Sequence, residues 1–314
     1  MKSFSTIILR QARHQALRMS QPQTRALTLT ISLALTLTLT LATTHNALAG
    51  RVITETIASK ILQADVPCNV YVPDGWDDSS KQYPVVYLLH GLSDTYEGWA
   101  GHGRAGLIAD RLIAAGDIVE MVIIMPNAGH SNPREVLNGY FNTPGRNYED
   151  FFFQELMPQL EAKYRCIGDK KHRAIMGLSM GGGGSTVYCQ HHPEMFSSCY
   201  AMSPWLDEKS GEVGGWDGPD DQLKVVCQSV RQNSALDFVD NASEETVAAL
   251  KTVRWTFDIG DDDWLLPLST DMHQKMNARG IRNELRVRDG NHNWEYWPMI
   301  LPFALQFASV GFAN

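Results

Sequence analysis

Residues 173–184 read Arg-Ala-Ile-Met-Gly-Leu-Ser-Met-Gly-Gly-Gly-Gly and contain the pattern G-x-S-x-G with Ser179 at its centre. The apolar residues 174–176 are typical of a buried parallel strand, and we expect a helix over residues 186–191. A serine on a sharp strand-to-helix turn presents its hydroxyl at the carboxyl end of the strand, beside the helix N-terminus. Ser179 is therefore a candidate nucleophile. The alternative is a glycine-rich turn with an idle serine, since short patterns recur by chance.

Around this stretch the chain alternates predicted strands with predicted helices. Residues 51–72 contain two β-rich segments that predict an antiparallel hairpin. Apolar runs predict further strands at 83–90, 118–125, 196–202, 253–259 and 283–288. Helices are predicted at 105–115, 148–164 and 268–279, and from about residue 295. This alternation, with no internal repeat, predicts an α/β fold with a mostly parallel central sheet covered by helices on both faces.

Two segments interrupt that rhythm. The polar loop that follows Pro126-Asn127-Ala128-Gly129 and runs to Arg146 is long enough to be functional rather than a simple connector. Residues 203–252 are rich in Gly, Asp and Pro up to Asp221, and then predict helix in two pieces, with Asn241 as the cap of the second. We interpret 203–252 as an insertion over the site, either a lid or a wall that sets specificity.

Residues 1–49 have the features of an export signal. They carry five cations and no acid, followed by an apolar, Thr-rich run at 26–42 and Ala-Leu-Ala at 47–49. This pattern predicts a secretory signal peptide cleaved after Ala49, a catalytic domain over residues 50–314, and a secreted or periplasmic protein. The alternative is a membrane anchor, for which the run has about the minimum length. A start at Met19 would leave a leader of ordinary length.

Charge and cysteine usage limit the classes of partner. Loss of the five leader cations changes the net charge from −8 to −13, which argues against nucleic acid or anionic lipid and favours a small or carbohydrate-linked substrate. We expect no stable membrane anchoring after cleavage.

No Cys or His cluster has metal-ligand spacing, so no metal and no cofactor are predicted. The chain has five cysteines: Cys68, Cys166, Cys189, Cys199 and Cys227. An oxidising compartment could pair four of them in disulfides, but their spacing does not reveal which pairs would form.

A serine nucleophile needs an imidazole base and a carboxylate that orients it. In this architecture they follow the serine in the order acid, then histidine, each in a loop after a later strand. His292 lies after the strand ending near residue 288, and no other histidine lies downstream of the acid in such a loop. The acid is expected among the three adjacent aspartates at residues 261–263, which follow the strand ending near residue 259. Asp263 is preferred, with Asp262 and Asp261 as alternatives.

The loops around this site supply the remaining candidates. A tetrahedral intermediate needs two donors for its oxyanion, and the backbone N–H groups of Met180 and Leu92 are the expected pair. His90 more plausibly braces its loop than takes part in chemistry. Trp99, Trp264 and Trp294 flank these loops and are candidate substrate contacts, although aromatic residues there are as often packing.

The motifs resemble those of one family. The segments 148–158, 173–182 and 192–196, the Leu-His-Gly-Leu loop at 89–92, the acid loop 260–264 and Gly-Asn-His-Asn-Trp at 290–294 are similar to the esterase D / putative esterase family of α/β hydrolases. That family includes S-formylglutathione hydrolases, feruloyl and acetyl-xylan esterases and the antigen 85 mycolyltransferases. The resemblance implies an α/β-hydrolase fold with Ser179, Asp263 and His292 as the triad.

The resulting prediction is a secreted serine carboxylic ester hydrolase that forms an acyl-enzyme on Ser179. Short-chain acyl, acetyl or feruloyl esters, including those of polysaccharides, are the expected substrates. An acyltransferase with the same triad is the first alternative, and a secreted binding protein without catalysis is the second.

Overall fold

The computed structural model describes residues 49–129, 139–208 and 220–313, with no side-chain description at 220–222. The predicted leader therefore lies outside the described residues apart from Ala49. The same holds for residues 130–138 of the predicted functional loop and 209–219 of the predicted insertion. The described residues belong to one compact unit that starts at Ala49.

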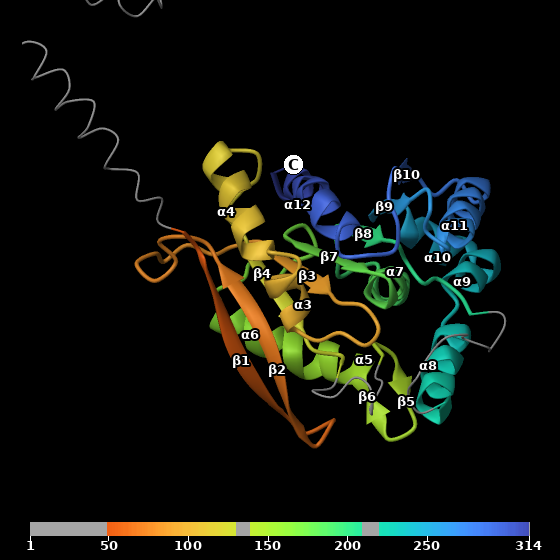
Figure 1. Cartoon of the computed structure of the whole chain (residues 1–314), viewed down its shortest axis with the longest axis horizontal. Helices are drawn as coiled ribbons and strands as arrows, with labels where there is room; N and C mark the ends of the chain where they lie inside the picture. Colours follow the sequence, from red (N-terminus) through yellow and green to blue (C-terminus); the bar gives the residue numbers. More distant parts are fainter. Residues whose placement is uncertain (1–48, 130–138, 209–219, 314) are drawn as a thin grey trace, which may run out of the picture. The chain divides into compact units, whose positions relative to one another are not determined.

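Within the described residues, eight strands form one sheet in the order β1-β2-β4-β3-β7-β8-β9-β10 (Figure 1). The predicted opening hairpin is confirmed, since β1 pairs antiparallel with β2 and β2 pairs antiparallel with β4. All other neighbours in the sheet are parallel. The strands are β1 (Arg51–Ser59), β2 (Ala64–Val72), β3 (Val85–Leu89), β4 (Val122–Pro126), β7 (Arg173–Leu178), β8 (Ser198–Met202), β9 (Arg254–Gly260) and β10 (Asn283–Arg288). A separate small hairpin joins β5 (Asn142–Thr143) and β6 (Arg146–Asn147).

Alternating side chains of the central strands enter two cores, one on each face of the sheet. In β3, Val86 and Leu88 pack under the helices α4 and α12, whereas Val85, Tyr87 and Leu89 face the larger core. The described helices are α3 (Glu97–Gly101), α4 (Ala105–Ala115), α5 (Tyr148–Phe151), α6 (Met157–Lys163), α7 (Met180–His191), α8 (Asp220–Gln232), α9 (Ala235–Asn241), α10 (Glu244–Leu250), α11 (Leu266–Ala278) and α12 (Tyr296–Ala313). This arrangement is the predicted three-layer α/β fold.

Three helical segments differ from the sequence-based expectations. The helix after Ser179 starts at Met180 rather than residue 186, because the four glycines that disfavour helix in isolation are buried here, three against other backbone and Gly184 against the Tyr140 side chain. The predicted helix over 148–164 contains a π-helical turn, η1 (Phe152–Leu156), between α5 and α6. The described part of the insertion holds three helices, α8 to α10, instead of two.

The predicted cap of the second insertion helix was wrong. Asn241 is the last residue of α9. The caps are serines, since Ser234 accepts a hydrogen bond from the Asp237 N–H at the start of α9, and Ser243 accepts one from the Thr246 N–H at the start of α10. Both serines precede an acidic first turn, which also favours a helix N-terminus.

Among the described helices, α12 is long and apolar enough to cross a membrane by length and composition. More than half of it is buried within the fold. Its buried residues, among them Ile300, Leu301 and Leu305, belong to the core it shares with α4. The core of the fold accounts for the apolar character of this helix.

Candidate active site

Ser179 lies on the turn between β7 and α7 in a strained backbone conformation, with φ 53° and ψ −117°. The two flanking glycines are sterically required. A Cβ on Gly177 would lie 2.5 Å from the Gly181 carbonyl oxygen, and a Cβ on Gly181 would lie 2.5 Å from the His90 carbonyl oxygen. The turn is held by its own backbone, because the Ser179 carbonyl accepts hydrogen bonds from the N–H groups of Gly183 and Trp205. The pattern G-x-S-x-G thus positions the hydroxyl at the carboxyl edge of the sheet.

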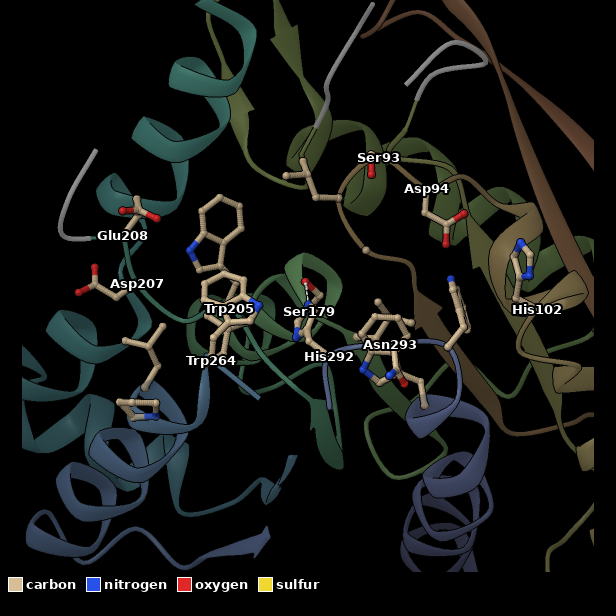
Figure 2. A pocket seen from close by; sticks show the side chains of 18 residues that line it. Ser93, Asp94, His102, Ser179, Trp205, Asp207, Glu208, Trp264, His292 and Asn293 are labelled. Atoms are coloured by element: carbon tan, nitrogen blue, oxygen red, sulfur yellow. Dashed lines mark hydrogen bonds between the residues drawn. The ribbon is translucent and has the colours of Figure 1, made fainter. Parts of the chain in front are cut away.

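The structure brings Ser179, His292 and Asp263 together in one hydrogen-bonded chain. His292 Nε2 lies 2.9 Å from Ser179 Oγ (Figure 2). His292 Nδ1 lies 2.9 Å from Asp263 Oδ2. Because an ionised carboxylate only accepts, Nδ1 carries the proton and Nε2 is free to accept the serine proton. His292 comes from the loop after β10 and Asp263 from the loop after β9, as the order of the sequence predicts.

The carboxylate of Asp263 is buried and fully engaged. It is 3% exposed. Burial raises the pKa of Asp263, but the hydrogen bond and charge of His292 lower it, and the result lies below the usual value. The Leu265 N–H, 2.9 Å from Oδ1, and the Ser203 hydroxyl lower it further. The group therefore stays ionised and oriented.

The other two aspartates of the triple have different roles. Asp261 is exposed, and its carboxylate accepts the Gly290 N–H of the His292 loop at 3.1 Å. Asp262 is also exposed, and its N–H donates to the Gly290 carbonyl. Neither side chain has a recorded contact with His292. Both residues connect the loop that carries Asp263 to the loop that carries His292, and so help to keep the two side chains within hydrogen-bonding distance.

The loop that carries Leu92 is braced by His90. His90 Nε2 accepts the backbone N–H groups of Ala128 and Gly129 at 3.0 and 3.2 Å, and Nδ1 donates to the Gly91 carbonyl at 2.8 Å. Burial lowers the pKa of His90 to about 4, so the ring is neutral at pH 7. This agrees with the interpretation of His90 as a brace. The loop comes close to the nucleophile, since a Cβ on Gly91 would lie 3.6 Å from Ser179 Cβ.

Met180 starts α7 directly after Ser179, so its N–H lies at the positive end of that helix. Leu92 follows Gly91 in the braced loop that comes close to Ser179. Both residues that were expected to supply the oxyanion-hole amides therefore lie in segments next to Ser179.

A cavity of about 1040 Å³ opens over Ser179 and His292. Trp264 and Trp294 line it, and Trp264 is 63% exposed at its wall. Trp99 does not line it, contrary to the candidate role in substrate contact. That indole is buried behind Trp294, with ring centroids 5.3 Å apart, and its N–H donates to the Leu89 carbonyl.

The cavity has two arms of different chemistry (Figure 2). On one side of Ser179 lie two tryptophans and two carboxylates: Trp205, Trp264, Asp207 and Glu208. On the other side lie polar residues: Ser93, Asp94, His102 and Asn293. Besides Ser179 and His292, the lining also includes Gly91, Leu92, Leu178, Leu265, Pro267, Leu268, Trp294 and Trp297.

Sequence reasoning did not identify Trp205, Asp207 and Glu208 as site residues. A signal was present, because they follow β8 at the same carboxyl edge of the sheet that supplies Asp263 and His292. Nothing in the sequence distinguished them from the remainder of the predicted insertion. Within the described part of the chain, no three His, Cys, Asp or Glu side chains gather in a way that could hold a metal ion.

A family model described as "Putative esterase" matches residues 59–308. The endo-1,4-beta-xylanase/feruloyl esterase of Xylanibacter ruminicola is 35% identical over 132 residues, which are 41% of this chain and 18% of that protein. Esterase Rv1288 of Mycobacterium tuberculosis is 32% identical over 141 residues, which are 43% of this chain and 28% of that protein. The chain thus spans less than a third of the length of either curated relative.

Solved structures match over more of their length. A ferulic acid esterase superposes with a TM-score of 0.80 and 42% identity, covering 84% of this chain and 99% of that one. An S-formylglutathione hydrolase from Agrobacterium tumefaciens superposes with a TM-score of 0.67 at 19% identity, covering 85% of this chain and 98% of that one, which shows the fold alone. The predicted α/β-hydrolase fold is confirmed, and these relatives agree with the predicted class of carboxylic ester hydrolases. The chain belongs to the putative esterase family.

Proposed function

We propose that the protein is a serine carboxylic ester hydrolase in which Ser179 is the nucleophile, His292 the general base and Asp263 the residue that orients His292. The observation that carries this proposal is the continuous chain of hydrogen bonds from Ser179 Oγ through His292 to Asp263, with 2.9 Å at each His292 contact, beneath an open cavity. A serine that only completes a turn would not need an oriented imidazole at its hydroxyl.

The proposed reaction proceeds in two halves. His292 Nε2 takes the proton of Ser179 as Oγ attacks the ester carbonyl, and the N–H groups of Leu92 and Met180 stabilise the oxyanion of the tetrahedral intermediate. His292 then gives the proton to the departing alkoxide, which leaves as the alcohol, and an acyl ester remains on Ser179. A water molecule, deprotonated by His292, repeats the sequence to release the carboxylic acid and regenerate the Ser179 hydroxyl.

The cavity supports an aromatic acyl group joined to a polar alcohol. The arm with Trp205 and Trp264 offers aromatic surfaces to a planar acyl group, and the arm with Asp94, His102 and Asn293 offers hydrogen-bonding groups to the hydroxyls of a sugar. Two relatives named above are a feruloyl and a ferulic acid esterase. We therefore propose hydroxycinnamoyl esters of carbohydrates as the substrate class.

The test is hydrolysis of methyl ferulate, p-nitrophenyl acetate, p-nitrophenyl butyrate and p-nitrophenyl octanoate by the wild-type protein and its Ser179→Ala variant. We expect the variant to lose at least about 10³-fold in kcat, because it lacks the nucleophile. Circular dichroism of both proteins controls for folding. Equal residual rates in the two proteins would refute the role of Ser179, and dominant transfer to an added sugar would make the protein an acyltransferase.

Export is part of the proposal, because carbohydrate esters of this kind are extracellular polymers. It rests on the cations, the apolar run and the Ala-Leu-Ala of residues 1–49. Sequencing the N-terminus of the exported protein should find Gly50. An N-terminus at Met1 or Met19 on a membrane-bound protein would support the anchor instead.

A further inference from the structure

The residue expected to become the first of the exported chain lies against a carboxylate. The Gly50 backbone N–H donates a hydrogen bond to Asp110 Oδ1, on α4, at 2.8 Å. The Tyr71 hydroxyl, on β2, donates to the same oxygen at 2.7 Å. Gly50 and Asp110 are partly buried, whereas Ala49 is exposed. The nitrogen that cleavage after Ala49 would free is therefore already fixed to a carboxylate of the fold.

Only glycine fits at this position. A Cβ on Gly50 would lie 2.5 Å from the Val72 carbonyl oxygen, 2.6 Å from a ring carbon of Tyr71 and 2.7 Å from the Tyr71 hydroxyl. Val72 belongs to the backbone of β2 that pairs with β1, and the Tyr71 side chain is fully buried, so neither yields easily. A larger residue would therefore push its nitrogen away from Asp110.

The Asp110 carboxylate has no cationic side chain as its partner. Within the described residues, Asp110 forms no ion pair with a Lys, Arg or His side chain. Arg51, the residue after Gly50, pairs with Asp77 instead. Burial and the neighbouring Asp110 carboxylate raise the pKa of Tyr71, so its hydroxyl is a neutral donor. A partly buried carboxylate with neutral donors is well suited to a positive charge at the same place.

Resting on the cleavage proposed above, we propose that Asp110 is the binding site for the α-ammonium group of the exported chain. Hydrolysis of the Ala49–Gly50 peptide bond by a signal peptidase consumes one water molecule and leaves a carboxylate on Ala49 and an amine on Gly50. That amine takes up a proton and is largely charged at neutral pH. The contact then joins two opposite charges in a partly buried place, where solvent and salt screen them less than at the open surface. Removal of the leader therefore stabilises the fold that it leaves behind.

The experiment compares two chains, residues 50–314 and residues 47–314. The longer chain keeps Ala-Leu-Ala before Gly50, so its Gly50 nitrogen stays in a peptide bond, and both chains contain the compact unit from Gly50 onward. We expect the Tm of the shorter chain to be about 2–4 °C higher, a shift of the size expected for one added partly buried ion pair in a domain of this length. In Asp110→Asn the two chains should have equal Tm values, because Asn keeps an acceptor for Tyr71 but removes the charge.

Two controls separate the ion pair from general effects on folding. Asp117→Asn, which removes an exposed carboxylate just after α4, should leave the Tm difference between the two chains unchanged. Acetylation of the Gly50 amine alone keeps one N–H and removes the charge, so the acetylated shorter chain should have the Tm of the longer one. This second comparison needs no substitution in the fold.

Equal Tm values of the unmodified wild-type chains would overturn the proposed site, and so would a difference that persists in Asp110→Asn or after acetylation. Hydrolysis of p-nitrophenyl acetate should be the same within about twofold in all these proteins, because Asp110 lies outside the cavity lining. Failure of the ion pair would therefore leave the Ser179 chemistry standing. An exported protein that begins at a residue other than Gly50 would overturn the cleavage and the α-ammonium site together.

Discussion

Ser203 connects Asp263, the proposed acid, to a tryptophan that packs on His292, the proposed base. Its hydroxyl accepts the Trp297 indole N–H at 3.1 Å and donates to the Asp263 carboxylate. The Trp297 ring stands edge-on to His292, with centroids 5.1 Å apart. Ser203 is fully buried and has φ 44°, a backbone conformation uncommon for a residue other than glycine. These contacts make Ser203 a positioning residue that acts through Asp263.

We predict that Ser203→Ala lowers kcat for p-nitrophenyl acetate about 10-fold with little change in KM, because Asp263 loses a donor worth about 1.5–3 kcal/mol and holds His292 less firmly. Ser203→Cys, a weaker donor of similar shape, should recover part of the rate. Ser198→Ala is the matched control, since the buried Ser198 hydroxyl, on the strand β8 that ends just before Ser203, has no hydrogen-bond partner among the described residues. An equal loss in both alanine variants would speak for packing alone.

The buried His90 predicts a pH dependence of stability. Its pKa is about 4 in the folded protein against 6.5 for an unperturbed histidine, so between these values the unfolded chain binds a proton that the folded chain does not. Stability is therefore lost as the pH falls from 6.5 to 4. At pH 5 the loss is about 2 kcal/mol.

We expect His90→Gln to be less stable than wild type at pH 7.5 but to lose less on acidification, because Gln cannot take up a proton. Urea unfolding of both proteins at pH 7.5 and pH 5 measures the difference. Parallel losses in the two proteins would mean that other groups carry the acid sensitivity.

At the scale of elements, the first turn of α7 approaches other backbone closely. A Cβ on Gly183 would lie 2.1 Å from the Trp205 carbonyl oxygen, and one on Gly182 would lie 2.9 Å from the Met202 carbonyl oxygen. The turn therefore packs directly against the end of β8 and the segment that carries the aromatic arm. Glycine is needed at these positions because a Cβ would prevent the helix backbone from packing this closely against the neighbouring segment.

We predict that Gly183→Ala destabilises the protein by about 2 kcal/mol and lowers activity on methyl ferulate, because the added methyl group displaces the Trp205 backbone. Gly101→Ala is the control, since a Cβ at Gly101, the last residue of α3, meets no atom within 4 Å. The measurement is the Tm of the two variants in thermal unfolding, and we expect Gly183→Ala to have the lower value. A Tm for Gly183→Ala equal to that of the control would show that the segment moves aside freely.

Most strands and helices could be predicted from local pattern. The strand 283–288 and the helix 105–115 have the predicted bounds. The start of α7 and the capping residues of α9 and α10 could not be predicted from local pattern, for different reasons. Four successive glycines disfavour helix locally, and only the backbone packed against them stabilises it. Asn241 is a good capping residue type, but Ser234 and Ser243 lie where the chain turns.

At the scale of the whole molecule, the fold does not depend on disulfides. All five cysteines are buried and free. Burial raises the pKa of Cys68, Cys166 and Cys227, so their thiols stay protonated and unreactive. Two packed cores, one on each face of the sheet, supply the stability instead.

We therefore predict that thiol titration of the freshly unfolded, unreduced protein finds five free thiols, and that titration of the folded protein finds almost none. A reducing agent should leave the Tm unchanged. Three or fewer thiols after unfolding, with a Tm that falls on reduction, would reveal a disulfide formed during export.

The order of chemical groups along the chain was sufficient to predict the fold class and to select the three residues that the structure joins by hydrogen bonds. Each of those residues follows a recognisable strand, and parallel strands deliver their carboxyl ends to one edge, so Ser179, Asp263 and His292 could be brought together without coordinates. The cavity could not be predicted in this way. Whether Trp99 or Trp205 contacts it, and whether Asp207 and Glu208 line it, depends on how loops from distant strands pack over that edge. Side-chain burial depends on the packing of the whole molecule, and the local sequence pattern does not predict it for residues in the loops after the strands.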